Sequence, residues 1–126
     1  MNRKDRFLSL DFGEVFFDGS FDTPLTPEKA GPLAEVLEAV RLAPSAVNRQ
    51  PWRVVVTDSA AHFYKKTSKG FVSEANGDMQ KIDMGIALAH FALAAEERGL
   101  PLRFELEAPQ LPTEAGTEYI ATYCFV

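Results

Sequence analysis

The residues best suited to holding a ligand lie in mid-chain, in a short segment bounded by two prolines. Ser45, Asn48 and Gln50 carry small polar side chains there, between Pro44 and Pro51. Each proline fixes its own φ and lacks a backbone donor, so a helix cannot continue through the segment. A rigid loop with several donors and acceptors can grip a flat polar ligand. A simpler interpretation is also open, in which Ser45 and Asn48 bond to their own backbone and only cap a turn.

Other groups that could catalyse a reaction are sparse. The chain has two histidines, His62 in a strand pattern and His90 inside an apolar helix pattern, and a single cysteine, Cys124. For His90 and Cys124, both among apolar residues, a core position is the simpler expectation. No spacing of His, Cys, Asp and Glu is typical of a metal site. We therefore assign no catalytic side chain and no metal site.

The composition excludes several classes of protein. The chain has 126 residues and a formal net charge of −5, with a pI near 5.0. Nucleic-acid binding requires a basic face, which this balance does not favour. No apolar run is long enough to span a membrane, and the first residues lack the apolar centre of a signal peptide. We expect one cytoplasmic domain over residues 1–126.

Two N-terminal segments lead to the polar loop. Residues 1–25 contain five phenylalanines and no strong helix pattern, so we expect an extended arm whose rings pack on a surface. A helix should then begin at Thr26, because threonine is a good N-cap and Pro27 suits the first helical position. Apolar residues at helical spacing continue it to about Leu42, with Gly31 and Pro32 weakening only its first turn.

The remaining pattern predicts the fold class. Strands are expected at 53–57, 61–65, 102–106 and 118–126, and a long helix from about 78 to 98, with a loop over 65–77 before it. Two strands precede the long helix and two follow it. We therefore predict an α+β fold: a mostly antiparallel sheet of about four strands, packed on a long central apolar helix and a second amphipathic helix.

The long helix is apolar almost all round between Met84 and Ala95, apart from His90. A helix without a polar face is normally covered on every side. A single sheet covers only one side. We therefore expect a partner, either a second copy in a homodimer or a half-domain of the same kind.

Two segments resemble a known family. Residues 41–53, Arg-Leu-Ala-Pro-Ser-Ala-Val-Asn-Arg-Gln-Pro-Trp-Arg, resemble the APSxxNxQPW segment of the nitroreductase-like FMN flavoproteins. Residues 81–100 are similar to the long central helix of that family, which has the form DxGIAxxxxxLAAxxxGL. The first motif is fairly specific, whereas the second alone is weak. The chain looks closest to the C-terminal half of a subgroup in which one chain carries two related halves.

The resemblance implies an FMN site between two halves, with this loop reaching across the interface. The positions that would face or flank the flavin are Pro44, Ser45, Ala46, Asn48, Gln50, Arg41 and Arg49. Arg53 also flanks the loop. The family often has a second serine where this chain has Ala46. The family's N-terminal phosphate-binding segment, RRSxRxF, is not matched by the spacing of Arg3, Lys4 and Arg6. A partner would therefore complete the site.

The implied activity is hydride transfer from NADH or NADPH, through FMN, to a small electron-poor acceptor such as a nitroaromatic or a quinone. Such a reaction needs no protein nucleophile, because the cofactor carries the hydride and the protein binds and orients it. The alternative is a non-catalytic half-domain that serves structure or assembly and has an empty flavin cleft.

Overall fold

The computed structural model describes residues 10–44, 50–66, 74–113 and 115–126. Its elements, in chain order, are α1 (Phe12–Val15), β1 (Phe16–Asp18), α2 (Pro27–Ala30), the 3-10 turn η2 (Gly31–Leu33), α3 (Ala34–Arg41), β2 (Trp52–Val56), β3 (Ala60–Lys66), α4 (Glu74–Glu97), β4 (Leu102–Glu105) and β5 (Thr117–Phe125). No helix in these ranges is long and apolar enough to cross a membrane.

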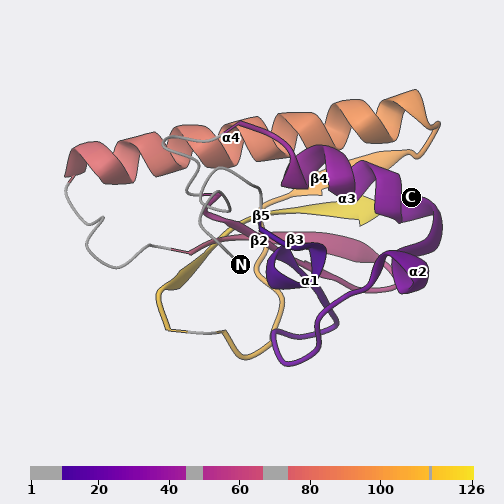
Figure 1. Cartoon of the computed structure of the whole chain (residues 1–126), viewed down its shortest axis with the longest axis horizontal. Coiled ribbons are helices and arrows are strands. Elements are labelled where there is room, and N and C mark those ends of the chain that lie inside the picture. Colours follow the sequence, from indigo (N-terminus) through magenta and orange to yellow (C-terminus); the bar gives the residue numbers. More distant parts are fainter. Residues whose placement is uncertain (1–9, 45–49, 67–73, 114) are drawn as a thin grey trace, which may run out of the picture.

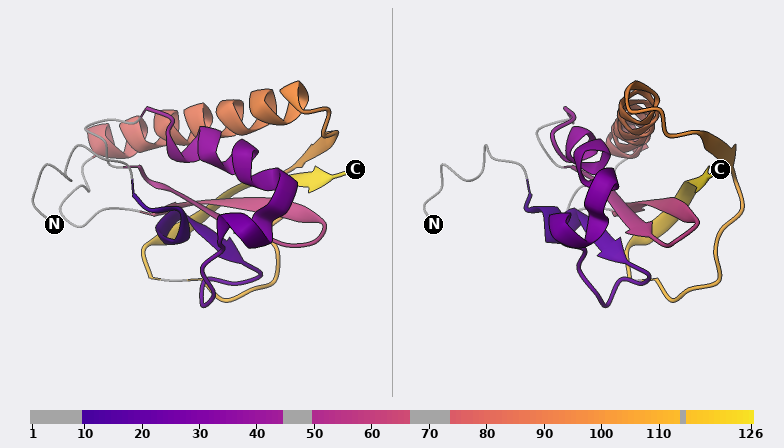
Figure 2. Two further views of the ribbon diagram at one scale, coloured as in Figure 1. Left: turned by 45° about the vertical axis from the view of Figure 1, so that its right-hand side comes forward. Right: turned by 90° about the vertical axis from the view of Figure 1, so that its right-hand side faces the viewer.

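The strands form one sheet in the order β1-β2-β3-β5-β4. The β1 and β2 strands are parallel, and every other neighbouring pair is antiparallel. Helices α3 and α4 lie side by side over one face of the sheet (Figures 1 and 2). The predicted α+β fold with a mostly antiparallel sheet on a long helix is confirmed, with five strands instead of about four.

The extra strand comes from the N-terminal segment and corrects one expectation. Residues 10–25 are not only an extended arm packed on a surface, because β1 joins the sheet beside β2 in register Phe16↔Val54, and Phe16 is fully buried. A strand of three residues is too short for an alternating pattern to be recognised in the sequence. The expectation that the aromatic rings complete a core holds for Phe16, Phe17 and Phe21. Phe7 lies outside the described residues.

The helix expected from Thr26 to Leu42 is interrupted. Its N-cap is as predicted, since the Lys29 backbone N–H donates to Thr26 Oγ1 at 3.2 Å. At Gly31, however, φ is 59°, and a 3-10 turn separates α2 from α3. The residue before a proline avoids the helical conformation, and Pro32 follows Gly31 directly. The effect of these two residues is therefore a break and not only a weak first turn.

The long helix α4 begins at Glu74, four residues before the expected start near Asp78. The predicted loop over 65–77 is correspondingly shorter, and its residues 67–73 lie outside the described part of the chain. The helix ends as expected, because Gly99 adopts a φ of 70°. The Leu100 backbone N–H then donates to the Ala95 carbonyl at 2.9 Å, a bond typical of a glycine-terminated helix.

The core forms where α4 crosses the middle of the sheet. Phe91 is fully buried. Its ring lies edge-on to Phe63 of β3 and stacks on Tyr123 of β5. Buried residues of α3 join the same cluster. The aromatic contacts thus fix the position of α4 on β3 and β5.

A smaller cluster covers the opposite face of the sheet. Phe21, in the turn after β1, packs edge-on against Tyr64 of β3, and Leu111, from the connection between β4 and β5, joins this cluster. On the same face His62 Nδ1 lies 2.8 Å from Thr122 Oγ1, which lies 2.7 Å from the Tyr119 hydroxyl. Burial lowers the pKa of His62 below its ordinary value.

The core position of Phe91 gives a stability prediction. Replacement of Phe91 by alanine removes a fully buried ring from both aromatic contacts, and the free energy of unfolding should fall by about 3–5 kcal/mol. Leu106→Ala is the control, because Leu106 is 71% exposed. It should cost less than about 0.5 kcal/mol. Urea denaturation of the three proteins measures both values, and equal losses in the two variants would contradict the assigned core.

The environment of His62 gives a prediction about pH. Its folded-state pKa is lowered by burial, so as pH falls the unfolded chain takes up the proton first, near its ordinary pKa of about 6.5. The neutral His62 therefore supports the fold above that pH, and this support is lost as pH falls toward the lower folded-state pKa. Between about pH 7.5 and about pH 5, His62→Gln should lose less stability than wild type in urea denaturation. Equal losses of stability in wild type and His62→Gln would contradict this role of His62.

Candidate functional site

The polar loop leaves α3 and enters β2 through positions of very different exposure. At the entry, Ala43 is buried and Pro44 is exposed. At the exit, Gln50 is buried with 1% of its surface exposed. The predicted site residues Ser45, Ala46, Asn48 and Arg49 lie outside the described residues. The structure therefore defines the two ends of the loop.

Gln50 joins three parts of the chain that are distant in sequence. Its side-chain Nε2 donates to the Arg41 carbonyl at 2.7 Å, and its Oε1 accepts a hydrogen bond of 2.7 Å from the Leu10 backbone N–H. Its φ is 47°, the one positive value among the described residues other than glycine. This conformation costs about 1–2 kcal/mol for a residue with a side chain. The side-chain bonds offset that cost, and the burial of Gln50 leaves almost no surface for contact with a cofactor.

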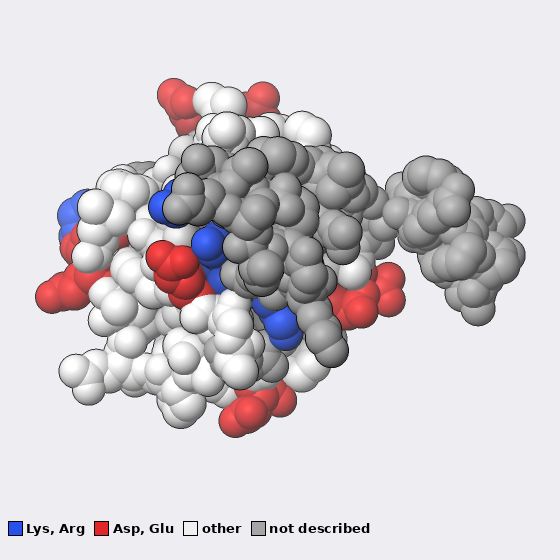
Figure 3. All heavy atoms as spheres, turned by 90° about the vertical axis from the view of Figure 1, so that its left-hand side faces the viewer, with Lys and Arg blue, Asp and Glu red and all other residues white. Residues whose placement is uncertain are grey.

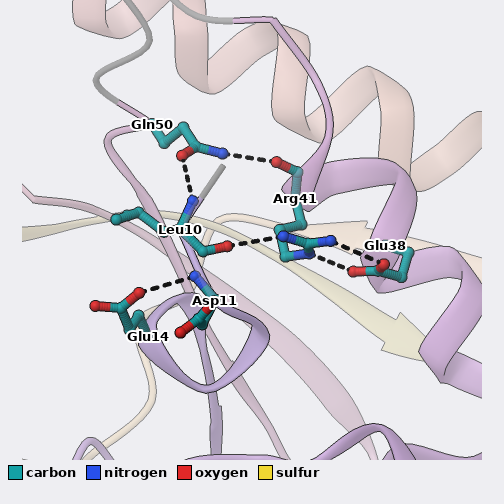
Figure 4. A network of polar contacts seen from close by, with 6 residues as sticks. All are labelled: Leu10, Asp11, Glu14, Glu38, Arg41 and Gln50. Carbon is teal, nitrogen blue, oxygen red and sulfur yellow. Dashed lines mark hydrogen bonds and ion pairs between the residues drawn. The ribbon is translucent and has the colours of Figure 1, made fainter. Parts of the chain in front are cut away.

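Arg41 is also occupied within the chain. Its Nη1 donates to the Leu10 carbonyl at 2.9 Å, and its Nη2 donates to Glu38 Oε2 at 3.1 Å, with a second bond from Nε to the same carboxylate. These bonds to Glu38 raise the pKa of the Arg41 guanidinium. Figure 4 shows the continuous network formed by Gln50, Leu10, Arg41 and Glu38. Glu38 therefore compensates the positive charge of Arg41, one of the positions expected to face or flank the flavin.

Arg53 supports the exit of the loop in a similar way. Its Nη1 donates to the Gln50 carbonyl at 2.8 Å and to the Trp52 carbonyl at 2.7 Å. A guanidinium that binds backbone oxygens stabilises a turn, whereas an arginine that faces solvent would be free to meet an anion. In this structure Arg53 holds the backbone where the loop joins β2.

Trp52 contributes a buried donor that we did not predict. The side chain is fully buried, and its Nε1 is the buried side-chain polar atom that lacks a hydrogen-bond partner within the described part of the chain. Leaving a buried donor unsatisfied costs about 1–3 kcal/mol. A buried water would satisfy such an atom. The sequence places Trp52 directly after the second proline of the loop.

A second unpredicted group is Lys65. It is buried opposite Trp52 in the β2–β3 pairing, and its Nζ lies 3.2 Å from Glu118 Oε1. The signal was visible in the strand alternation, since Ala61, Phe63 and Lys65 occupy one face of β3. A lysine on the otherwise apolar inward face of a strand indicates a special environment.

The face at this end of the sheet has mixed charge. Figure 3 views it directly and shows Lys and Arg side chains beside the grey atoms, with acidic side chains around them. A cavity of about 350 Å³ lies at the other end of the sheet, where Leu33, Val56 and Phe125 contribute to its wall. The apolar cavity and the polar loop are therefore separate features of the molecule.

The described residues supply only the two ends of the candidate cofactor loop. Pro44 at the loop entry is exposed, whereas the indole N–H of Trp52, unpartnered among the described residues, belongs to a fully buried side chain. A phosphate requires fixed cationic donors, and Arg41 and Lys65 are each paired with a carboxylate. Within the described part of the chain, the arrangement therefore offers little to a phosphate.

Comparisons with known proteins agree with this fold. The family described as "Putative TM nitroreductase" matches residues 24–95, more than half of the chain and a range that includes the loop. The crystal structure of a putative nitroreductase from Thermotoga maritima is similar with a TM-score of 0.58 and 22% sequence identity, covering 93% of this chain and 41% of that one.

At that identity the structural likeness shows the fold alone, and this chain spans about two-fifths of the length of that relative. A comparison with curated proteins found no match. The family match over residues 24–95 confirms the resemblance that the loop and the central helix indicated. The chain belongs to the family described as "Putative TM nitroreductase".

Proposed function

We propose that this chain forms one half of an FMN-dependent oxidoreductase of the nitroreductase type. The observation that carries the proposal is the family match, because its range contains the whole polar loop. FMN, when bound, accepts a hydride from NADH or NADPH and passes it to a small electron-poor acceptor such as a nitroaromatic or a quinone. The protein holds and orients the ring. The cytoplasmic location expected from the composition remains a prediction.

The loop residues divide into two groups in this proposal. Pro44, Ser45, Ala46 and Asn48 meet the flavin through backbone and short side chains, and Arg49 compensates negative charge. Arg41 and Gln50, which we first placed at the cofactor, instead hold the ends of the loop. Their hydrogen bonds within the chain support this assignment. The buried Trp52 indole N–H is a candidate donor to a buried water.

The partner that completes the site is proposed to cover α4. Two large apolar side chains of this helix, Ile82 and Leu93, are 64% and 61% exposed, and Ala89 lies exposed between them. Side chains at this spacing share one face of a helix. The chain also spans only 41% of its structural relative. A second copy of the chain, or a half-domain of the same kind, would bury this face.

An alternative function has some support. If the chain serves only structure or assembly, its flavin cleft stays empty. The pairing of Arg41 with Glu38 and of Lys65 with Glu118 favours this alternative, because it leaves neither cation for a phosphate. Binding measurements separate the two functions.

The first prediction concerns flavin affinity. The purified chain should bind both FMN and riboflavin, with dissociation constants within about tenfold of each other, because each charge-assisted bond to a phosphate contributes about 1.5–3 kcal/mol and few are available. The chain has one tryptophan, so quenching of Trp52 fluorescence reports binding next to the loop. Absence of quenching by either flavin would favour the structural alternative. A preference for FMN of a hundredfold or more would reveal a phosphate site.

Asn48→Ala tests whether the loop itself makes the contact. Loss of one hydrogen bond to the ring should weaken binding by roughly five- to a hundredfold, which corresponds to about 1–3 kcal/mol. The melting temperature should stay close to that of wild type. A large drop in melting temperature with unchanged affinity would show that Asn48 only caps a turn.

A further prediction concerns assembly. Sedimentation equilibrium should show a dimer at micromolar concentration, and Leu93→Asp should dissociate it, since a buried unpaired charge costs several kcal/mol by order of magnitude. Leu106→Asp is the matched control, because Leu106 is also exposed but lies beyond β4. A wild-type monomer would contradict the homodimer and leave a separate half-domain as the partner.

A further inference from the structure

The carbonyl of Arg41 lies at the last residue of α3, where the helix itself supplies no partner. The last four carbonyls of any α-helix lack intrahelical donors and must be satisfied from outside. The Leu42 and Ala43 backbone N–H groups donate to the carbonyls of Glu38 and Val40. The Arg41 carbonyl accepts its bond from the Gln50 side chain, at 2.7 Å. The residue that caps the helix is therefore the residue at the far end of the loop.

The bond between Gln50 and Arg41 closes the loop across its base. It spans nine positions of sequence and joins the last residue of α3 to the residue two before β2. The other end of the same amide accepts from the Leu10 N–H, and Arg41 donates to the Leu10 carbonyl. Leu10 is thus held on both sides, and three chain segments form one closed set of hydrogen bonds (Figure 4).

The burial and backbone of Gln50 limit what can replace it. Its side chain is 1% exposed, so its two partners are poorly reached by water. Its φ is 47°, and its side-chain amide reaches the Arg41 carbonyl at the end of α3. A residue without both a donor and an acceptor at this length leaves the Arg41 carbonyl or the Leu10 N–H unsatisfied.

We propose that Gln50 is a positioning residue, which sets the separation and direction of the two ends of the 44–49 loop and thereby its contact with the flavin. The predicted effect on flavin binding rests on the proposed function. The link between the two ends of the loop rests only on the hydrogen bonds of Gln50. It assigns Gln50 no contact with the cofactor.

Flavin affinity in a pair of variants provides the first test. Gln50→Met keeps the length and burial of the side chain but removes both hydrogen bonds, and the FMN dissociation constant should rise about tenfold. Thr122→Val is the matched control, because Thr122 is also buried and hydrogen-bonded but lies on the opposite face of the sheet. It should lose comparable stability and keep the wild-type constant within about twofold. Both constants are measured well below the melting temperature of each variant.

A double-mutant cycle separates positioning from a loss of stability. If Gln50 acts by placing the loop, Asn48→Ala should weaken FMN binding less in the Gln50→Met background than in wild type, because the contact is already misplaced. If Gln50 only stabilises the fold, the two effects on affinity should multiply independently, and that result would overturn the proposal. Should Gln50→Met fail to fold, Gln50→Asn replaces it, since its shorter amide cannot span both partners.

A readout without flavin keeps the proposal distinct from the proposed function. Trypsin can cut after Arg49, inside the loop, and mass spectrometry quantifies cleavage of the Arg49–Gln50 bond in the unliganded protein. Cleavage should be about tenfold faster in Gln50→Met than in Thr122→Val. If wild type binds no flavin, the proposed function fails, and faster cleavage still supports closure by Gln50. Equal cleavage rates in the two variants, or faster cleavage with unchanged FMN affinity, would overturn the proposal.

Discussion

The packing of α4 on the middle of the sheet is the constraint on which the other features depend. Phe91 contacts Phe63 of β3 and Tyr123 of β5, and these two strands are hydrogen-bonded neighbours. Because α3 packs beside α4 in the same core cluster, the position of α4 also determines where α3 ends. The C-terminus of α3 in turn determines where the loop begins. The candidate site is thus positioned by apolar contacts at a distance from it.

Around the loop, hydrogen bonding is used mainly to satisfy the backbone. Gln50, Arg41 and Arg53 all donate to main-chain carbonyls. Main-chain groups at a helix end and a strand start are costly to bury without partners. Polar side chains that bind main-chain groups in this way stabilise the ends of the loop. They leave fewer donors and acceptors to bind a ligand. In the proposed function, the cofactor contacts are therefore left to Pro44, Ser45, Ala46 and Asn48.

The sequence predicted features that depend on neighbouring residues. Four strands, the cap at Thr26 and the helix end at Gly99 follow from local patterns, and the structure has them within a residue or two. The strand β1 was missed because it is stable only when paired with β2, far along the chain. The tasks of Gln50 and Arg41 were missed for the same reason, since both bind Leu10, which no local pattern connects to the loop. The cofactor contacts expected from Ser45, Ala46 and Asn48 remain a prediction.

The place of β5 in the sheet has a consequence for how the chain acquires its fold. Among the described elements β5 comes last in sequence, yet it lies between β3 and β4. During synthesis the edge of β3 therefore stays open until residue 117 and those after it have emerged. Strand pairing over such a sequence separation is slow, and an open strand edge invites pairing with other chains. This part of the nascent chain is accordingly most exposed to aggregation just before its sheet closes, when the apolar residues of α3, α4 and the other four strands have already been made.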